Sequence, residues 1–233
     1  MRCRFLEIST TSKNVLASLQ YYRSLGFVEL ISSDAWDHPY AVVSDGRINI
    51  GLHDRELSSP ALSFVLPGLA DALGSSMSRH LHATYLRTGD EQFHEAGFED
   101  PAGQTLIMLE ARTFSPPDIP DTGTSLLGYF EGYALLAGDM EASIACWEAL
   151  GFVLIEETKR PHRQVTLTSD NLNLLLHEDR RQREPALLFS ASDPEERVRL
   201  LQQHNFELQR DAVDHTGALL RGPEGLLMRL VGE

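Results

Sequence analysis

Alternating hydrophobic and polar residues open the chain, and a helical spacing of hydrophobic residues follows them. Residues 4–10, "RFLEIST", alternate as a half-buried strand does. Residues 14–26, "NVLASLQYYRSLG", have the spacing of a helix, with Asn14 as a candidate N-cap and Gly26 as a stop. Short apolar stretches follow at 27–32, 40–45 and 48–53. The pattern predicts a strand, a helix and three strands.

The same order of elements is predicted a second time. A strand at 61–66 precedes a helix that begins within 67–73, and three more strands are predicted at 82–87, 93–98 and 105–110. Paired units of this kind favour an α+β fold, with helices on the outer face of a curled, mixed sheet. The opposite face of the sheet is then concave.

Both units recur in the second half of the chain. Four stretches of the first half match four of the second in the same order: 5–27 with 130–152, 44–54 with 169–179, 60–64 with 185–189, and 99–110 with 221–232. The chain is therefore interpreted as a tandem duplication. In the second half, Asp193 and Pro194 are typical of a helix start. Residues rich in Pro, Asp, Gly, Ser and Thr separate the halves, which predicts domains at 1–113 and 127–233 and a linker at 114–126.

Composition and charge narrow the choice of partners. The net charge of -14 and the scattered Lys and Arg residues argue against a nucleic-acid partner, and the acidity suits a cationic ligand. No apolar run reaches the roughly 20 residues that span a bilayer, so no membrane partner is expected. The first residues do not resemble a secretory signal, and two cysteines make neither a disulfide framework nor a thiolate metal site. We expect a cytoplasmic protein with two reduced thiols.

Two short motifs occur in each half. One is an aromatic residue at the end of a helix before Leu-Gly-Phe, in "YYRSLGF" (21–27) and "CWEALGF" (146–152). The other is a turn into the last strand, "EDPAGQTL" (99–106) and "RGPEGLL" (221–227). In order and spacing the chain resembles the vicinal oxygen chelate superfamily, which includes glyoxalase I, bleomycin-resistance proteins, fosfomycin-modifying enzymes and extradiol dioxygenases. The resemblance implies two tandem domains, each a pair of βαβββ modules around a cavity.

The resemblance also implies where a divalent metal would be bound in metal-dependent members. The corresponding positions in the two halves hold Glu7 and Gly132, residues near Ala61 and Ala186, and Ile107 and Arg229. Only Glu7 is a metal ligand by type, and one carboxylate does not hold a catalytic cation. We therefore expect no metal and no other cofactor. The alternative is a displaced site for a divalent metal made of Glu7, His80, His82 and His94.

Polar and aromatic residues on the expected concave face are candidates for ligand binding. Asn49 and His53 recur as Asn173 and His177, and alternation places them opposite Ile48, Ile50 and Leu52. Two interpretations of these pairs remain equally open: contacts to a ligand, or polar residues at the end of a sheet. Trp36 and Tyr40, near His38 in a predicted hairpin, suit a ligand mouth or rim packing. With Glu7 and Arg229 these residues form the predicted ligand-binding set, whereas Tyr21, Tyr22 and Trp147 are expected to pack in the core.

Two functions from different classes remain open. The first is a metal-independent protein that binds a small molecule, for drug sequestration or sensing, with the better site in the first domain. The second is a metal-dependent glyoxalase-like lyase or dioxygenase with displaced metal ligands. An enzyme is the less favoured of the two, because most of the usual metal-ligand positions hold other residues. A protein that acts through its surface is the third outcome. The chain is expected to be a monomer or a homodimer.

Overall fold

The computed structural model describes residues 3–31, 36–69, 80–89, 94–111, 125–169, 171–211 and 217–232. The first half contains β1 (Arg4–Thr11), α1 (Val15–Ser24), β2 (Val28–Leu30), β3 (Tyr40–Ser44), β4 (Asn49–His53), β5 (Ala61–Leu66), β6 (His82–Arg87), β7 (Glu95–Glu99) and β8 (Thr105–Glu110). The second half contains β9 (Tyr129–Leu136), α3 (Met140–Ala149), β10 (Val153–Thr158), β11 (Gln164–Thr168), β12 (Asn173–His177), β13 (Ala186–Ala191), α4 (Pro194–Gln203), β14 (Leu208–Arg210), β15 (Ala218–Arg221) and β16 (Leu227–Gly232).

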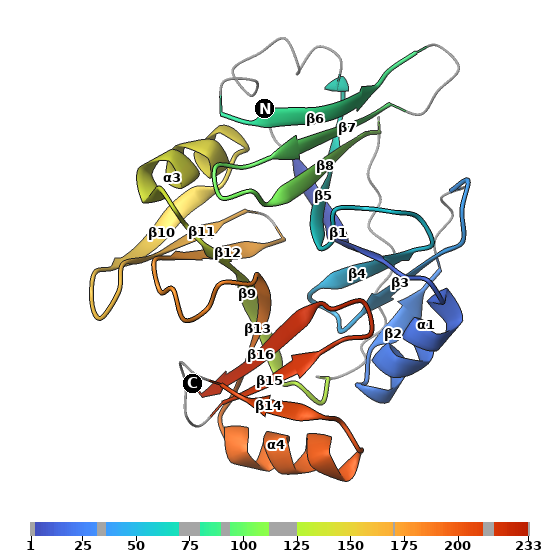
Figure 1. Cartoon of the computed structure of the whole chain (residues 1–233), viewed down its shortest axis with the longest axis vertical. Helices are drawn as coiled ribbons and strands as arrows, with labels where there is room; N and C mark the ends of the chain where they lie inside the picture. Colours follow the sequence, from blue (N-terminus) through green and yellow to red (C-terminus); the bar gives the residue numbers. More distant parts are fainter. Residues whose placement is uncertain are drawn as a thin grey trace.

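Each half forms its own curled sheet, and neither sheet closes into a barrel. The strand order is β2-β3-β4-β1-β5-β8-β7-β6 in the first sheet and β10-β11-β12-β9-β13-β16-β15-β14 in the second. In both, the first strand runs parallel to the fourth and antiparallel to the fifth, so two modules meet at the centre of the sheet. The predicted α+β fold of two tandem halves, with two modules meeting in each sheet, is confirmed (Figure 1).

Two parts of the prediction fall outside the described residues. The helix expected from 67–73 falls largely on 70–79, and the predicted linker at 114–126 falls largely on 112–124. Since β8 ends at Glu110 and β9 begins at Tyr129, the proposed domain boundaries stay a prediction.

The helix ends follow the sequence signals. The Asn14 side chain accepts a hydrogen bond from the backbone N–H of Ala17, and Asp193 does the same for Glu196. Beyond the last turn of α1, Gly26 has a φ of +91°, the left-handed conformation that glycine adopts without strain. The helix therefore stops where the chain must turn back into β2.

Alternation along the strands separates two faces of each sheet. In the first half, Ile48, Ile50 and Leu52 are fully buried in the core with Leu19 and Tyr22 of α1. The opposite, concave face of β1 carries Glu7 and Ser9. Helix packing thus uses the apolar face and leaves polar groups on the other side.

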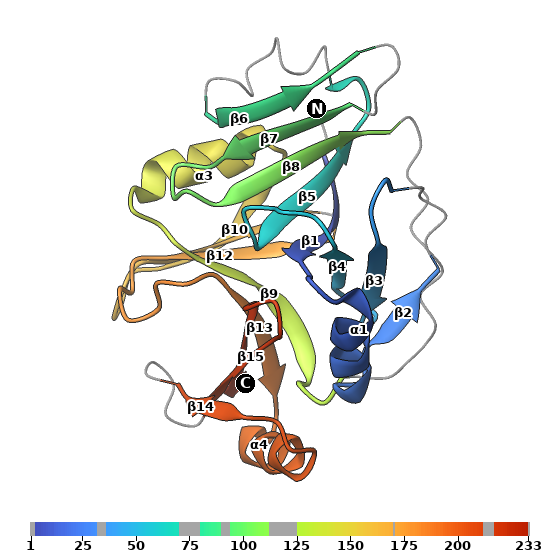
Figure 2. The same ribbon diagram turned by 45° about the vertical axis from the view of Figure 1, so that its right-hand side comes forward.

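The two halves share one hydrophobic core through the repeated aromatic residues. Tyr22 of α1 donates a hydrogen bond to Glu224 of the second half at 3.0 Å, and its hydroxyl lies against Gly222. Trp147 of α3 lies 6.4 Å, centroid to centroid, from Phe64 of the first half. Figures 1 and 2 show α1 of the first half beside the second half and α3 of the second half beside the first-half sheet. Tyr22 and Trp147 are fully buried, so the predicted packing role is confirmed.

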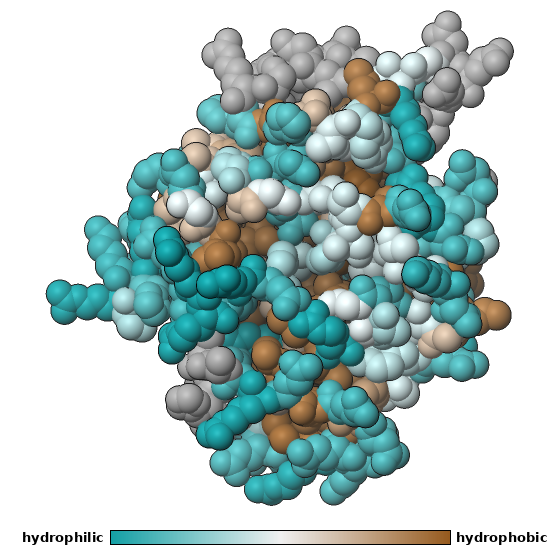
Figure 3. Space-filling view, in the orientation of Figure 1, coloured by the Kyte–Doolittle hydropathy of each residue, from teal (hydrophilic) through white to brown (hydrophobic). Residues whose placement is uncertain are grey.

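On the face seen in Figure 3, hydrophilic residues predominate and hydrophobic residues lie between them in patches. In the described part of the chain, no helix is long and apolar enough to cross a membrane. Cys3 and Cys146 are both free thiols, as expected. Burial raises the pKa of Cys3 to about 11 and that of Cys146 to about 12, so neither forms a reactive thiolate near neutral pH.

Candidate functional site

A buried carboxylate lies at the centre of the concave face of the first half. Glu7 on β1 is 1% exposed. Its Oε1 accepts hydrogen bonds from His53 Nε2 at 2.7 Å and from Ser9 Oγ at 2.8 Å, and its Oε2 accepts one from the Tyr40 hydroxyl at 2.6 Å. Ser63 on β5 contacts the Ser9 hydroxyl at 2.6 Å. Both carboxylate oxygens of Glu7 are therefore engaged by side chains of the protein itself.

A chain of hydrogen bonds joins Glu7 to the surface through two imidazoles. His53 Nδ1 lies 2.9 Å from His38 Nε2, and His38 Nδ1 lies 2.8 Å from Asp37 Oδ1. The Asp37 side chain is 93% exposed, whereas that of His38 is largely buried. The hydrogen bond from His38 is the main reason why the pKa of Asp37 lies below its ordinary value.

Trp36 covers this network and links it to an ion pair across the concave face. Its ring lies 5.0 Å from that of His53 and 5.4 Å from that of Tyr40, centroid to centroid. The Arg55 guanidinium lies 5.6 Å from the centroid of the Trp36 ring. Arg55 also makes two hydrogen bonds of 3.1 Å to Glu95 on β7, which the Tyr85 hydroxyl contacts as well. Arg55 therefore ties the first module of the sheet to the second.

Replacement of Arg55 with methionine should lower the free energy of unfolding by about 1–2 kcal/mol at neutral pH, because Glu95 loses its bidentate partner. Although burial alone would raise the pKa of Glu95, hydrogen bonds from Arg55 and Tyr85 hold it below its ordinary value of 4.5. The stabilisation is thus complete above that value and is lost as the pH falls through the lowered pKa. Urea unfolding over a pH series should show the two proteins converging in acid; a difference that stays constant would contradict this role.

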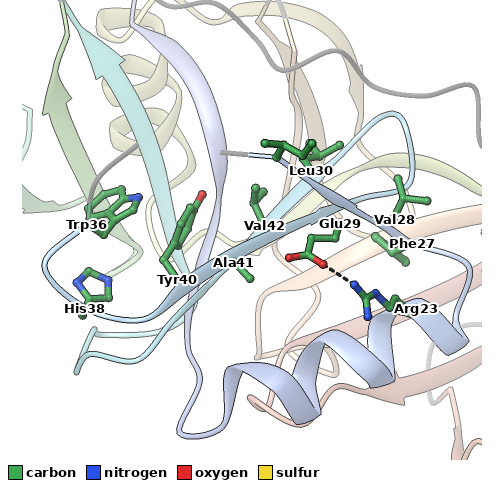
Figure 4. A pocket seen from close by; sticks show the side chains of 11 residues that line it. Arg23, Phe27, Val28, Glu29, Leu30, Trp36, His38, Tyr40, Ala41 and Val42 are labelled. Carbon is green, nitrogen blue, oxygen red and sulfur yellow. Dashed lines mark hydrogen bonds and ion pairs between the residues drawn. The ribbon is translucent and has the colours of Figure 1, made fainter. Parts of the chain in front are cut away.

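The pocket of the first half lies beside the Glu7 network, along β2 and β3. Its volume is about 730 Å³. Figure 4 shows Trp36, His38 and Tyr40 at one end, Leu30 and Val42 further along, and the ion pair between Arg23 and Glu29 at the other. The lining of this pocket differs from the expected one, which included Glu7, Asn49 and His53. Trp36 and Tyr40 line the pocket, whereas Glu7 and His53 are buried behind them.

The strand register identifies the residues beside Glu7 and corrects one expected position. Glu7 pairs with Ser63, and Ser63 pairs with Ile107 on β8. In the second half, Gly132, Leu188 and Arg229 form the same row. The residues in register are Ser63 and Leu188, each two residues after the expected Ala61 and Ala186, which pair instead with Ser9 and Ala134.

The residues of this row do not fit a metal centre of the family type. A cation at Glu7 would have to displace three hydrogen-bond donors, and neither Ser63 nor Ile107 offers an imidazole or a carboxylate. Over the ranges that the structure describes, no group of three or more His, Cys, Asp or Glu residues could hold a metal ion.

The alternative ligands are not brought together either. His80 and His82 are exposed at the β6 edge of the sheet. His94 Nδ1 lies 2.6 Å from Glu110 and its Nε2 lies 3.0 Å from the carbonyl oxygen of Gly89. Glu7 is engaged with His53, Ser9 and Tyr40 instead.

The repeated asparagines bind the main chain. Asn49 donates a hydrogen bond from its side-chain nitrogen to the carbonyl oxygen of Leu6 at 3.2 Å, and Asn173 does the same for Glu131 at 3.0 Å. Leu6 and Glu131 are equivalent residues, each the extra residue of the bulge in the first strand of its half. Of the two readings left open for these asparagines, this contact matches the polar sheet position.

The second half arranges its polar residues differently. His177 is 2% exposed, and neither ring nitrogen has a hydrogen-bond partner among the described residues. Burial lowers its pKa, which favours the neutral ring. Arg229 is buried and binds Asp211 and Gln182. The set predicted for ligand binding therefore lies in two separate places: Glu7, Trp36, Tyr40 and His53 in one half, and His177 and Arg229 in the other.

Several residues of the network were not singled out from the sequence. Ser9 could have been found, since it follows Glu7 by two residues on an alternating strand. Ser63, Asp37, Arg55 and Glu95 carry no local signal, because their contacts join residues far apart in the chain or depend on the path of a loop.

Solved structures with the same fold include dioxygenases and a synthase. The 2,3-dioxygenase LapB from Pseudomonas sp. KL28 is 15% identical and has a TM-score of 0.60 over 99% of this chain and 92% of its own. The 2,2',3-trihydroxybiphenyl 1,2-dioxygenase from Sphingomonas wittichii strain RW1 is 14% identical, with a TM-score of 0.60 over 100% and 91%. A mutant 4-hydroxymandelate synthase from Streptomyces coelicolor is 12% identical, with a TM-score of 0.57 over 99% and 92%.

Sequence comparisons add nothing to this likeness. No protein-family profile matches the chain, and no curated protein sequence matches it significantly. At identities this low the likeness concerns the fold alone, and the chain has the vicinal oxygen chelate fold in its two-domain form.

Proposed function

We propose that this chain is a metal-independent small-molecule-binding protein, of the kind that sequesters or senses a drug-like compound. The observation that carries the proposal is the hydrogen bonding of the Glu7 carboxylate. This residue occupies the position where the resemblance implies a metal ligand, yet both of its oxygens accept hydrogen bonds from the protein itself. The place of a metal centre is taken by an internal network, and a pocket opens beside that network.

The lining of the pocket indicates the class of ligand. Trp36 and Tyr40 offer aromatic surfaces, and Leu30 and Val42 offer aliphatic ones, so a planar or apolar body would be bound between them. The net charge of -14 and the exposed carboxylate of Asp37, beside His38 of the pocket lining, favour a cationic group on the ligand. An aromatic amine combines both properties.

A thermal-shift screen of the full chain, with EDTA present throughout, tests this proposal. The library should contain aromatic amines, together with neutral and carboxylate compounds of the same shape. A ligand at one hundred times its Kd adds about 2.7 kcal/mol of stability, which raises the Tm of a chain of this size by roughly 5–10 °C. We expect such a rise with amines in EDTA.

Two variants test whether the ligand binds in this pocket, and added metal ions distinguish this function from the metal-dependent alternative. Trp36→Leu should remove the shift, whereas Tyr129→Leu, a change of an exposed aromatic residue outside the pocket, should retain it. A stabilisation that appears only after Fe(II), Mn or Zn is added, and that Glu7→Gln abolishes, would favour the metal-dependent lyase or dioxygenase instead.

A further inference from the structure

His177 of the second half lacks the partners that its counterpart has in the first. It closes β12 as His53 closes β4, and both imidazoles are buried. His53 uses one nitrogen for Glu7 and the other for His38, whereas neither nitrogen of His177 has a partner in the described part of the chain. Buried polar groups are almost always hydrogen-bonded, so this imidazole calls for a partner that the described residues do not supply.

The second half cannot supply that partner in the way the first half does. Gly132 stands where the first half has Glu7, and a Cβ atom there would lie only 2.7 Å from the carbonyl oxygen of Asn173. Gln164 stands opposite His177, where Tyr40 stands opposite His53. Both the carboxylate and the phenol that serve the first network are therefore missing from the corresponding positions.

Donors instead gather at Arg229, which lies in the same row of the sheet as Gly132, the counterpart of Glu7. Arg229 binds Asp211 through Nε and the side-chain oxygen of Gln182 through Nη1. The nitrogen of the Gln182 amide is consequently left as a buried donor without a partner among the described residues. Burial lowers the pKa of His177, the negative charge of Asp179 raises it, and the positive charge of Arg229 lowers it.

Nearby carboxylates are already neutralised. Asp179 forms a close ion pair with Arg181, and Asp211 is bound by Arg229. An incoming anion would thus meet the N–H groups of Gln182 and His177 and the positive charge of Arg229 rather than an unpaired carboxylate.

We propose that the second half binds the carboxylate group of a small organic acid between His177 and Gln182, beside Arg229. The ligand carboxylate would take the part that Glu7 plays for His53 in the first half, where the contact is 2.7 Å. The proposal is independent of the pocket at Trp36, since it rests on residues of the other half.

Acetate is the probe for this site, and acetamide and chloride are its controls. Histidine side-chain ¹H–¹⁵N NMR of the full chain should show a saturable shift of the His177 signal on addition of acetate. Neutral acetamide, which has the same shape, should give a much weaker change, and chloride at equal ionic strength should give none. A His177 signal that responds no earlier than those of the exposed His80 and His204 overturns the proposal.

A variant that retains the Arg229–Asp211 pair guards against misfolding. Gln182→Met removes the buried amide donor and should weaken acetate binding about tenfold or more, because a hydrogen bond to a charged group is lost. Arg221→Met, which changes an arginine paired with Glu184 at the surface, should bind as the parent does. Unchanged affinity in Gln182→Met would show that acetate is not bound at this place.

Discussion

Replacement of Glu7 with alanine is expected to lower the free energy of unfolding by about 3–5 kcal/mol, because three buried or partly buried groups lose their shared hydrogen-bond acceptor. The change removes the carboxylate oxygens that bind the Tyr40 hydroxyl, the Ser9 hydroxyl and the His53 ring. Urea unfolding at neutral pH measures the effect, and the shared core of the two halves favours a single transition.

The exposed pair between Arg23 and Glu29 provides the matched control. Its side chains are 55% and 40% exposed, so Glu29→Ala should cost less than about 1 kcal/mol. Glu7→Gln retains the shape of the side chain but directs an amide N–H toward groups that already donate, and should cost about 1–3 kcal/mol. Similar stabilities of Glu7→Ala and Glu29→Ala would mean that the buried network is not formed in solution.

Replacement of Gly51 with alanine should destabilise the fold by about 2–3 kcal/mol, although alanine is ordinarily better than glycine inside a strand. Gly51 on β4 pairs with Ser9 on β1, and a Cβ atom at this position would overlap the Glu7 carboxylate. The glycine is thus required by a close approach of a side chain rather than by its own backbone conformation. Chemical denaturation of the variant measures the loss.

A double-mutant cycle shows whether the loss comes through Glu7. In a Glu7→Ala background the same change at Gly51 should cost far less, because the overlapping carboxylate is gone. The second half already holds this reversed combination, with Gly132 in place of Glu7 and Leu175 in place of Gly51. Equal costs in the two backgrounds would separate Gly51 from the network.

The fold could be predicted from the sequence because its signals are local and occur twice. The strands predicted at 61–66, 82–87 and 105–110 match the bounds of β5, β6 and β8, and the N-caps Asn14 and Asp193 marked the starts of α1 and α4. The pairing of the halves could not be predicted. It depends on Tyr22 and Trp147, whose helical spacing indicates burial but not which half they pack against.

The site was less predictable than the fold for a related reason. Glu7, Tyr40 and His53 were expected at one cavity, His53 from strand alternation, Tyr40 from a predicted hairpin and Glu7 from the family resemblance. The network depends further on which atoms of these side chains meet and on a β-bulge that shifts the register of β1. The alternation of residues along a strand predicts neither a bulge nor a side-chain rotamer. The burial of Glu7 behind the pocket therefore could be seen only in the structure.

Histidine side-chain NMR during a titration with Mn(II) tests most directly whether the Glu7 network replaces a metal centre. Mn(II) is paramagnetic and broadens the signals of any imidazole near its binding site. If Glu7 is held by His53, Tyr40 and Ser9, the signals of His38 and His53 should keep their width while exposed histidines such as His80 broaden. Selective early loss of the His53 signal would show that a metal is bound at Glu7 and would contradict metal-independent binding.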